Sequence, residues 1–63
     1  MYCIYVSING KNIQQVINDY NQVVTSSTIQ ELMPLAKDIK NKYTNMNVSI
    51  VDMDSGAILV DYQ

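Results

Sequence analysis

The Asn9-Gly10 pair constrains the fold of this 63-residue chain more than any other feature. Residues 2–8, which precede the pair, alternate two sets of side chains with the period of two that is typical of a strand. Asn-Gly favours a two-residue type I′ turn, because both central residues of that turn need a positive φ. The sequence therefore predicts that the chain folds back at this pair into a hairpin in which Val6 faces Ile13.

Residues 12–24 fit two structures. As a helix, they place their apolar side chains on one face, with Asn12 in the N-cap position. They contain neither Ala nor Leu, however, and their apolar members are β-branched or tyrosine, which lowers helix propensity. A third strand also stabilises a hairpin that is marginal by itself. We therefore favour a strand after Gly10, a break at Asn18-Asp19 and a strand-like segment 20–25, with a helix over residues 12–24 as the alternative.

Residues 28–43 predict a helix, because their apolar side chains recur at helical spacing. Ser27 or Thr28 can cap its start, with a glutamine or glutamate three positions later completing a capping box. Pro34 lacks an N–H and crowds the preceding turn, which predicts a kink or a late start near Met33.

The end of the chain predicts a second hairpin. Residues 48–51 and 57–62 flank a turn that Gly56 can close at positive φ. The expected fold is a single α+β domain spanning residues 1–63, in which a small antiparallel sheet packs against one helix. The sheet would consist of an N-terminal hairpin or meander and the C-terminal hairpin. The alternative order is β-α-α-β-β, with residues 12–24 helical.

A chain of this length buries only about 60% of the surface that its unfolded form exposes, so such domains are commonly reinforced. Cys3 is the single cysteine and there is no histidine, so neither an internal disulfide nor a zinc site is expected. We expect no metal and no cofactor. Only 16% of the residues are charged, which lowers the repulsion between copies. Self-association into a homodimer, through a sheet edge or the helix face, is the remaining reinforcement.

The residue types argue against an enzyme. Without histidine, the commonest general base is missing and Cys3 has no imidazole to activate it. Asp52 and Asp54 are paired acids, but capping of their own turn explains them more simply. The spacing of these two acids matches the start of a calcium-binding loop. The match then ends, because Gly56 stands where an oxygen ligand is needed.

Charge is distributed unevenly, since the chain after Asn45 has three acids and no base. An acidic, methionine-bearing surface can dock on a basic or adaptable partner. The residues that we expect to bind such a partner are Asp52, Asp54, Asp61, Met46 and Met53.

The composition of the chain, with seven Asn, eight Ile and five Tyr but no Arg, is typical of AT-rich coding DNA. The leading hypothesis is therefore a non-enzymatic protein-binding module, encoded by a phage or mobile element, that inhibits or regulates a larger host protein, for example as a host-defence antagonist.

Two other functions remain open. A small nucleic-acid-associated protein could use a basic cluster on the helix together with a stacking tyrosine, although four Lys and a net charge of −2 make nucleic acid an improbable partner. The residues concerned are Lys37, Lys40, Lys42 and Tyr5. A structural or assembly subunit could form by pairing of sheet edges. The chain starts without the pattern of a signal peptide, so we expect a cytoplasmic protein, in the host cytoplasm if virally encoded, with no membrane contact.

Overall fold

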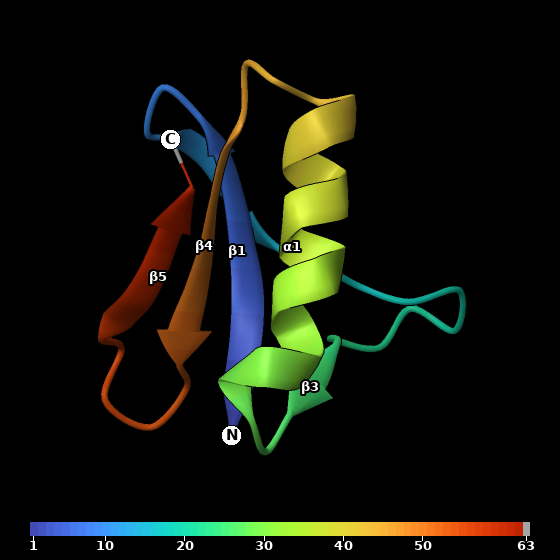
Figure 1. Ribbon diagram of the computed structural model, residues 1–63, viewed down its shortest axis with the longest axis vertical. Helices are drawn as coiled ribbons and strands as arrows, with labels where there is room; N and C mark the ends of the chain where they lie inside the picture. Colours follow the sequence, from blue (N-terminus) through green and yellow to red (C-terminus); the bar gives the residue numbers. More distant parts are fainter. Residues whose placement is uncertain (63) are drawn as a thin grey trace.

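The chain folds back at Asn9-Gly10 as the sequence predicts. In the computed structural model, which describes residues 1–62, both turn residues have positive φ, 52° at Asn9 and 74° at Gly10. Figure 1 shows the elements, which are β1 (Tyr2–Ile8), β2 (Lys11–Gln15), β3 (Thr25–Ser26), α1 (Ile29–Lys42), β4 (Asn47–Asp52) and β5 (Ile58–Tyr62). The strands form one antiparallel sheet in the order β2-β1-β4-β5, with β3 also paired to β1. The predicted α+β fold is thus confirmed.

The register of the first hairpin differs from the prediction. Ile8 pairs with Lys11, but Val6 pairs with Gln14 rather than with Ile13. One extra residue of β2 lies opposite β1 between these pairs, and Asn12 there has a φ of 56°. This is a β-bulge, in which two residues of one strand oppose one residue of the other. Because side chains alternate across a strand, the bulge moves Ile13 to the opposite face of the sheet.

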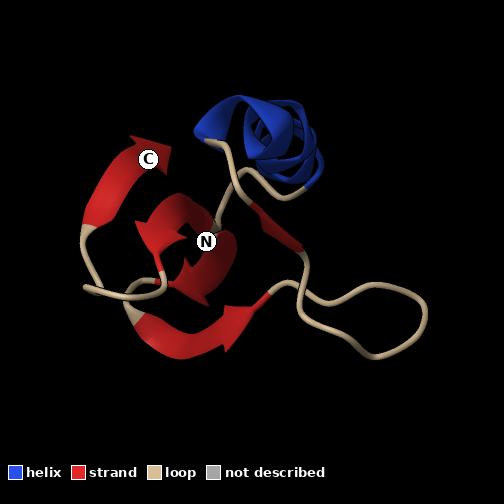
Figure 2. Cartoon of the chain, turned by 90° about the horizontal axis from the view of Figure 1, so that it is seen from below, coloured by secondary structure: helices blue, strands red, loops and turns tan. Residues whose placement is uncertain are grey.

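Residues 16–24 form neither the alternative helix nor a full strand. The strand-like segment predicted over residues 20–25 contains only the start of β3, and one isolated bridge joins Ile17 to Val23. Val16 still donates its N–H to the Ile4 carbonyl, which keeps the chain on the sheet until the loop begins. The loop then projects beyond α1 (Figures 1 and 2).

α1 begins at Ile29, with Thr28 in the N-cap position. The late start predicted near Met33 is therefore wrong, and Pro34 lies exposed inside the helix. The predicted capping by Ser27 or Thr28 side chains is also replaced. The Ser26 hydroxyl, which comes from β3, accepts the Thr28 N–H at 3.2 Å.

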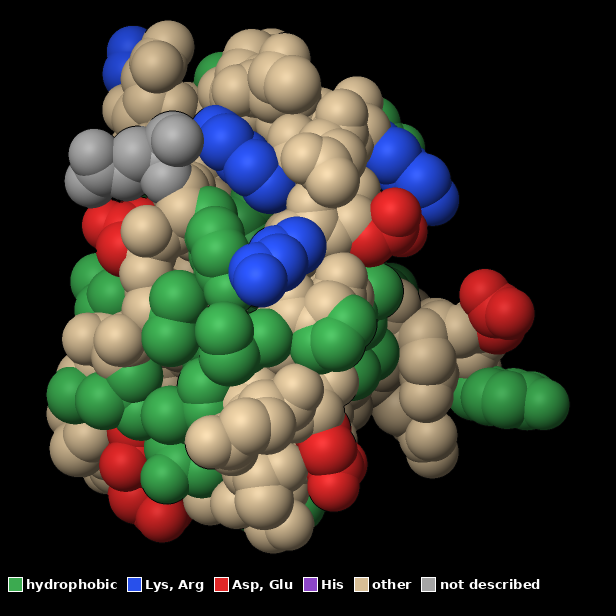
Figure 3. All heavy atoms as spheres, in the orientation of Figure 1, with side chains coloured by type: hydrophobic (Ala, Val, Ile, Leu, Met, Phe, Trp, Pro, Cys, Tyr) green, Lys and Arg blue, Asp and Glu red, His purple; other side chains and the backbone are tan. Residues whose placement is uncertain are grey.

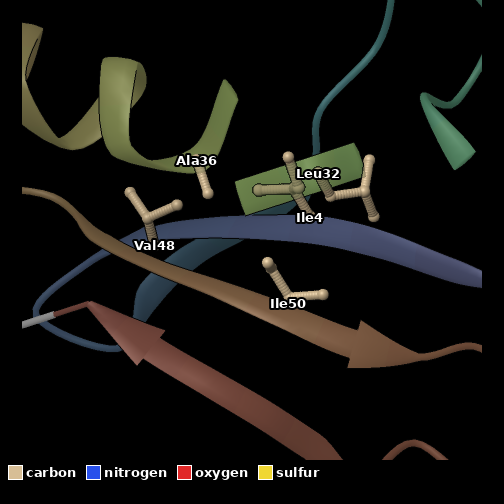
Figure 4. Close-up of a cluster of buried hydrophobic side chains, with 5 residues drawn as sticks. All are labelled: Ile4, Leu32, Ala36, Val48 and Ile50. Atoms are coloured by element: carbon tan, nitrogen blue, oxygen red, sulfur yellow. The ribbon is translucent and has the colours of Figure 1, made fainter. Parts of the chain in front are cut away.

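The core lies between α1 and one face of the central strands β1 and β4. Figure 4 shows its five buried side chains, which are Ile4, Leu32, Ala36, Val48 and Ile50. Ile4 and Ile50 are paired across the two central strands, and both side chains are fully buried. Burial of such a side chain contributes about 1.5–3 kcal/mol, so this cluster explains why the period-two pattern of β1 and β4 folds against a helix.

The second hairpin closes as predicted. Gly56 has a φ of 77°, and its N–H donates to the Asp52 carbonyl at 2.8 Å. The Asp52 carboxylate accepts the Asp54 N–H at 2.9 Å, so it caps the turn. Within residues 1–62, no helix is both long and apolar enough to cross a bilayer.

Candidate functional site

The face of the sheet opposite α1 carries a hollow of about 370 Å³. Figure 2 shows α1 on one side of the strands, so no helix of the described residues covers this second face. Residues of all four longer strands and of the turn before β5 line the hollow. They are Tyr5, Ser7, Ile13, Asn47, Ser49, Val51, Gly56, Ile58 and Asp61.

The floor of the hollow consists of the side chains of β1 and β4 that strand alternation directs away from the core. Residues of β1 and β4 that point away from the core lie side by side, with Tyr5 opposite Ser49 and Ser7 opposite Asn47. The same alternation buries Cys3 on this face, where its sulfur accepts a hydrogen bond from the Gln15 amide at 3.8 Å. The floor is therefore a row of hydroxyl and amide groups that can form hydrogen bonds with a bound molecule.

Two β-bulges supply the apolar walls. The bulge in β2 turns Ile13 onto this face, as described above. In β5, Val60 pairs with Ile50 whereas Ile58 pairs with Val51, so that one extra residue lies between them. Regular alternation would place Ile58 on the core side with Val60. Instead both isoleucines line the hollow, and they are 63% and 62% exposed.

These isoleucines are the site residues that the sequence did not reveal. In a regular register, both belong to the apolar stripe that faces the helix. The one local signal is Asn12, because asparagine tolerates the left-handed conformation that the first bulge uses. Nothing comparable in the sequence marks the bulge in β5.

The acidic and methionine residues predicted to bind a partner do not form one surface. Asp52 ends β4, and Met53 and Asp54 lie in the turn that follows, where the Asp54 carboxylate is 3.9 Å from the amino group of Met1. Met46 precedes β4 at its other end. Asp61 lies across from Ser49 and lines the hollow. Among the described lining residues, Asp61 carries the only charge.

The predicted basic cluster is largely engaged in contacts within the chain. Lys40 donates to the Met46 carbonyl at 2.6 Å and to the Thr44 carbonyl at 3.0 Å, which holds the loop after α1. Lys42 forms an ion pair with Asp38 at 3.3 Å, and Lys37 is exposed. Tyr5 lies on the sheet face that α1 does not cover. The structure therefore does not bring this tyrosine together with the lysines.

The donor groups of the described residues include no cluster of three His, Cys, Asp or Glu side chains that could hold a metal ion. The arrangement that remains is a shallow hollow with a polar floor, apolar walls and one carboxylate. Such a surface can hold a peptide or a side chain by burial of apolar area and by hydrogen bonds. Comparison with protein-family models, curated proteins and solved structures gives no match for this chain.

Proposed function

We propose that this chain is a non-enzymatic protein-binding module that inhibits or regulates a larger protein by covering part of its surface. The observation that carries the proposal is the pair of bulges that turn Ile13 and Ile58 out of the core. Each bulge interrupts a sheet ladder and leaves a large apolar side chain in water. In a domain of 63 residues, this costs stability that a regular register would retain.

The residue types of the hollow support binding over catalysis. Its hydroxyl groups have no imidazole beside them, since the chain contains no histidine. Its polar floor and apolar walls match the usual composition of an interface, in which a desolvated apolar centre is bordered by hydrogen-bonding groups. A partner that places an apolar side chain between the two isoleucines would bury both of them.

Quantitative affinity capture from the cells that encode the chain tests this proposal. The double variant Ile13→Thr, Ile58→Thr keeps β-branched residues in the strands and removes apolar area from the walls. We expect proteins captured by the parent chain to be lost with this variant. Tyr43→Ala is the matched control, because Tyr43 is an exposed apolar residue at the far end of α1. Equal capture by the parent and the double variant would contradict the proposal.

A second variant separates this surface from the acidic turn. Asp54→Lys reverses the charge of a carboxylate that is 89% exposed and lies outside the hollow. If the hollow binds the partner, capture should persist with this variant at physiological salt, where exposed charges are screened over about 8 Å. Loss of capture with Asp54→Lys alone would instead place the interface at the turn.

A further inference from the structure

The hollow on the open sheet face has a negative charge. Asp61 is the one charged residue among the described residues that line it, and the register places this residue on the open face beside Ser49. The strands on this side of the hollow, β4 and β5, belong to the part of the chain after Asn45, which has three acids and no base. A group that enters the hollow therefore meets a negative potential, which attracts cations and repels anions.

The lysines of the chain lie outside the hollow. Lys37, Lys40 and Lys42 belong to α1, on the other side of the sheet, and Figure 3 shows lysine side chains over and beside the C-terminal half of this helix. Lys11 pairs with Ile8 on the α1 side of the sheet. The described lining residues thus include no lysine that would offset the charge of the hollow.

The neutral groups of the hollow suit the rest of an arginine side chain. An arginine carries a guanidinium group, which only donates hydrogen bonds, at the end of an apolar stem. The Ser49 hydroxyl beside Asp61 can accept such a bond, and Tyr5 follows on the next strand. A guanidinium binds a carboxylate through two parallel hydrogen bonds and stacks on tyrosine rings. Ile13 and Ile58 offer apolar surface to the stem.

Desolvation distinguishes a basic side chain from a neutral one in this hollow. Any group that fills the hollow removes water from the Asp61 carboxylate. A neutral apolar side chain leaves that loss uncompensated, whereas a cation replaces the lost water with a charged hydrogen bond. An acidic side chain would add repulsion between like charges. The hollow of about 370 Å³, near the lower end for binding pockets, is large enough for one long side chain.

We propose that the protein partner presents an arginine to this hollow, with its stem between Ile13 and Ile58 and its guanidinium on the Asp61 carboxylate. The inference rests on the proposed function, because it names the chemistry of the residue that enters the same surface. The partner is therefore basic where it contacts β5. Complementary charge of this kind also raises the rate at which two proteins associate.

Titration of the chain with capped tripeptides, followed through its amide signals in heteronuclear NMR spectra, tests the inference. The middle residue of the peptide is arginine, citrulline or leucine, with glycine on either side. Citrulline has nearly the shape of arginine but no charge. Because one side chain buries little area, we expect dissociation constants in the millimolar range. The arginine peptide should shift the signals of Tyr5, Ser49 and Asp61. It should bind about fivefold more tightly than the other two, which is the upper range for an exposed ion pair.

Asp61→Asn keeps the shape of the side chain and removes its charge. This variant should bind the arginine peptide as weakly as the citrulline peptide. Asp54→Asn is the matched control, because Asp54 is an exposed carboxylate outside the hollow, and this variant should keep the preference for arginine. Asp61 is exposed, so the melting temperatures of both variants should equal that of the parent, and they are measured in parallel. High salt should reduce the preference of the parent, because it screens exposed charges.

Several outcomes would overturn the proposal. They are a parent chain whose hollow signals no peptide shifts, a citrulline or leucine peptide that binds as tightly as the arginine peptide, and a preference for arginine that survives in Asp61→Asn. Affinity capture separates such a failure from a failure of the proposed function. Loss of capture with Ile13→Thr, Ile58→Thr but not with Asp61→Asn would refute the arginine and leave the binding module intact. Equal capture by the parent and the double isoleucine variant would instead refute the module itself.

Discussion

The Ser26 hydroxyl donates a hydrogen bond of 2.8 Å to the Glu31 carboxylate. Ser26 is the single buried polar residue among those described, and its oxygen also accepts the Thr28 N–H. These two bonds join β3 to the first turn of α1. The first four N–H groups of a helix have no partner within the helix. Here the side chain of a strand residue accepts one of them, the N–H of the N-cap residue Thr28.

Ser26→Ala should therefore destabilise the protein by about 1–2 kcal/mol, because it leaves the Thr28 N–H without this acceptor and the Glu31 carboxylate without this donor. For a domain of this size, that corresponds to a fall in melting temperature of roughly 4–8 °C per kcal/mol. Thermal unfolding followed by circular dichroism measures it. Ser27→Ala is the control, because Ser27 is exposed, and its melting temperature should stay close to that of the parent. Equal values for both variants would show that the Ser26 contacts contribute nothing.

Lys40→Met should destabilise the protein by about 1–2 kcal/mol. The substitution keeps the aliphatic stem and removes the ammonium group that bonds the Thr44 and Met46 carbonyls. Urea unfolding measures the change as a lower midpoint with an unchanged slope. Lys37→Met is the matched control on the same helix, since Lys37 makes no such contact with the described residues. A midpoint for Lys40→Met as high as that of Lys37→Met would mean that the loop after α1 does not depend on this lysine.

Tyr62→Phe should leave stability unchanged or raise it by up to about 1 kcal/mol. The Tyr62 hydroxyl is buried and has no hydrogen-bond partner among the described residues, so it is desolvated without compensation. Phenylalanine keeps the ring that packs against the core. The free energy of unfolding in urea decides the question, and a clear loss of stability would reveal that the hydroxyl has a partner in solution.

Gly56→Ala should cost about 1 kcal/mol, and Gly56→Val should cost more. A Cβ atom at this position would meet no atom within 4 Å, so the cost comes from the positive φ of 77° alone. Gly56→Asn is the control, because asparagine adopts this conformation more readily than other residues that carry a Cβ. We expect the melting temperature to be highest with Gly at position 56 and to fall in the order Asn, Ala, Val. An alanine variant as stable as the parent would show that the turn adopts another conformation without loss.

Much of the fold follows from local sequence signals. Asn9-Gly10 and Gly56 predict turns because their residues accept positive φ at little cost, and both turns form as expected. The alternation of β1 and the helical spacing of residues 28–43 likewise predict the strand and α1, since each pattern places one apolar face against a common core. These properties need only a few neighbouring residues.

The start of α1 needed more than a local pattern. Pro34 suggests a late start, yet the helix begins at Ile29, where a strand residue supports its first turn. Ser26 reaches that position because β3 pairs with Tyr2 and Cys3 at the other end of the sequence. Propensity at one residue is a weak preference that such tertiary contacts override.

Most of the candidate site was decided by tertiary structure, although the sequence had named Tyr5 and Asp61, which line the hollow. The sequence placed Ile13 opposite Val6 on the inner face, a regular register would also turn Ile58 toward the helix, and the acidic residues suggested a single docking surface. The structure instead separates Asp52 and Asp54, at the turn after β4, from Asp61, which lies opposite Ser49 and lines the hollow, and it turns both isoleucines onto the open face. A shift of one residue in register reverses the face of every side chain that follows, and register depends on pairing between distant strands. The sequence by itself therefore determined which segments form strands, helix and turns, whereas only the packed sheet determined which side chains became available for binding.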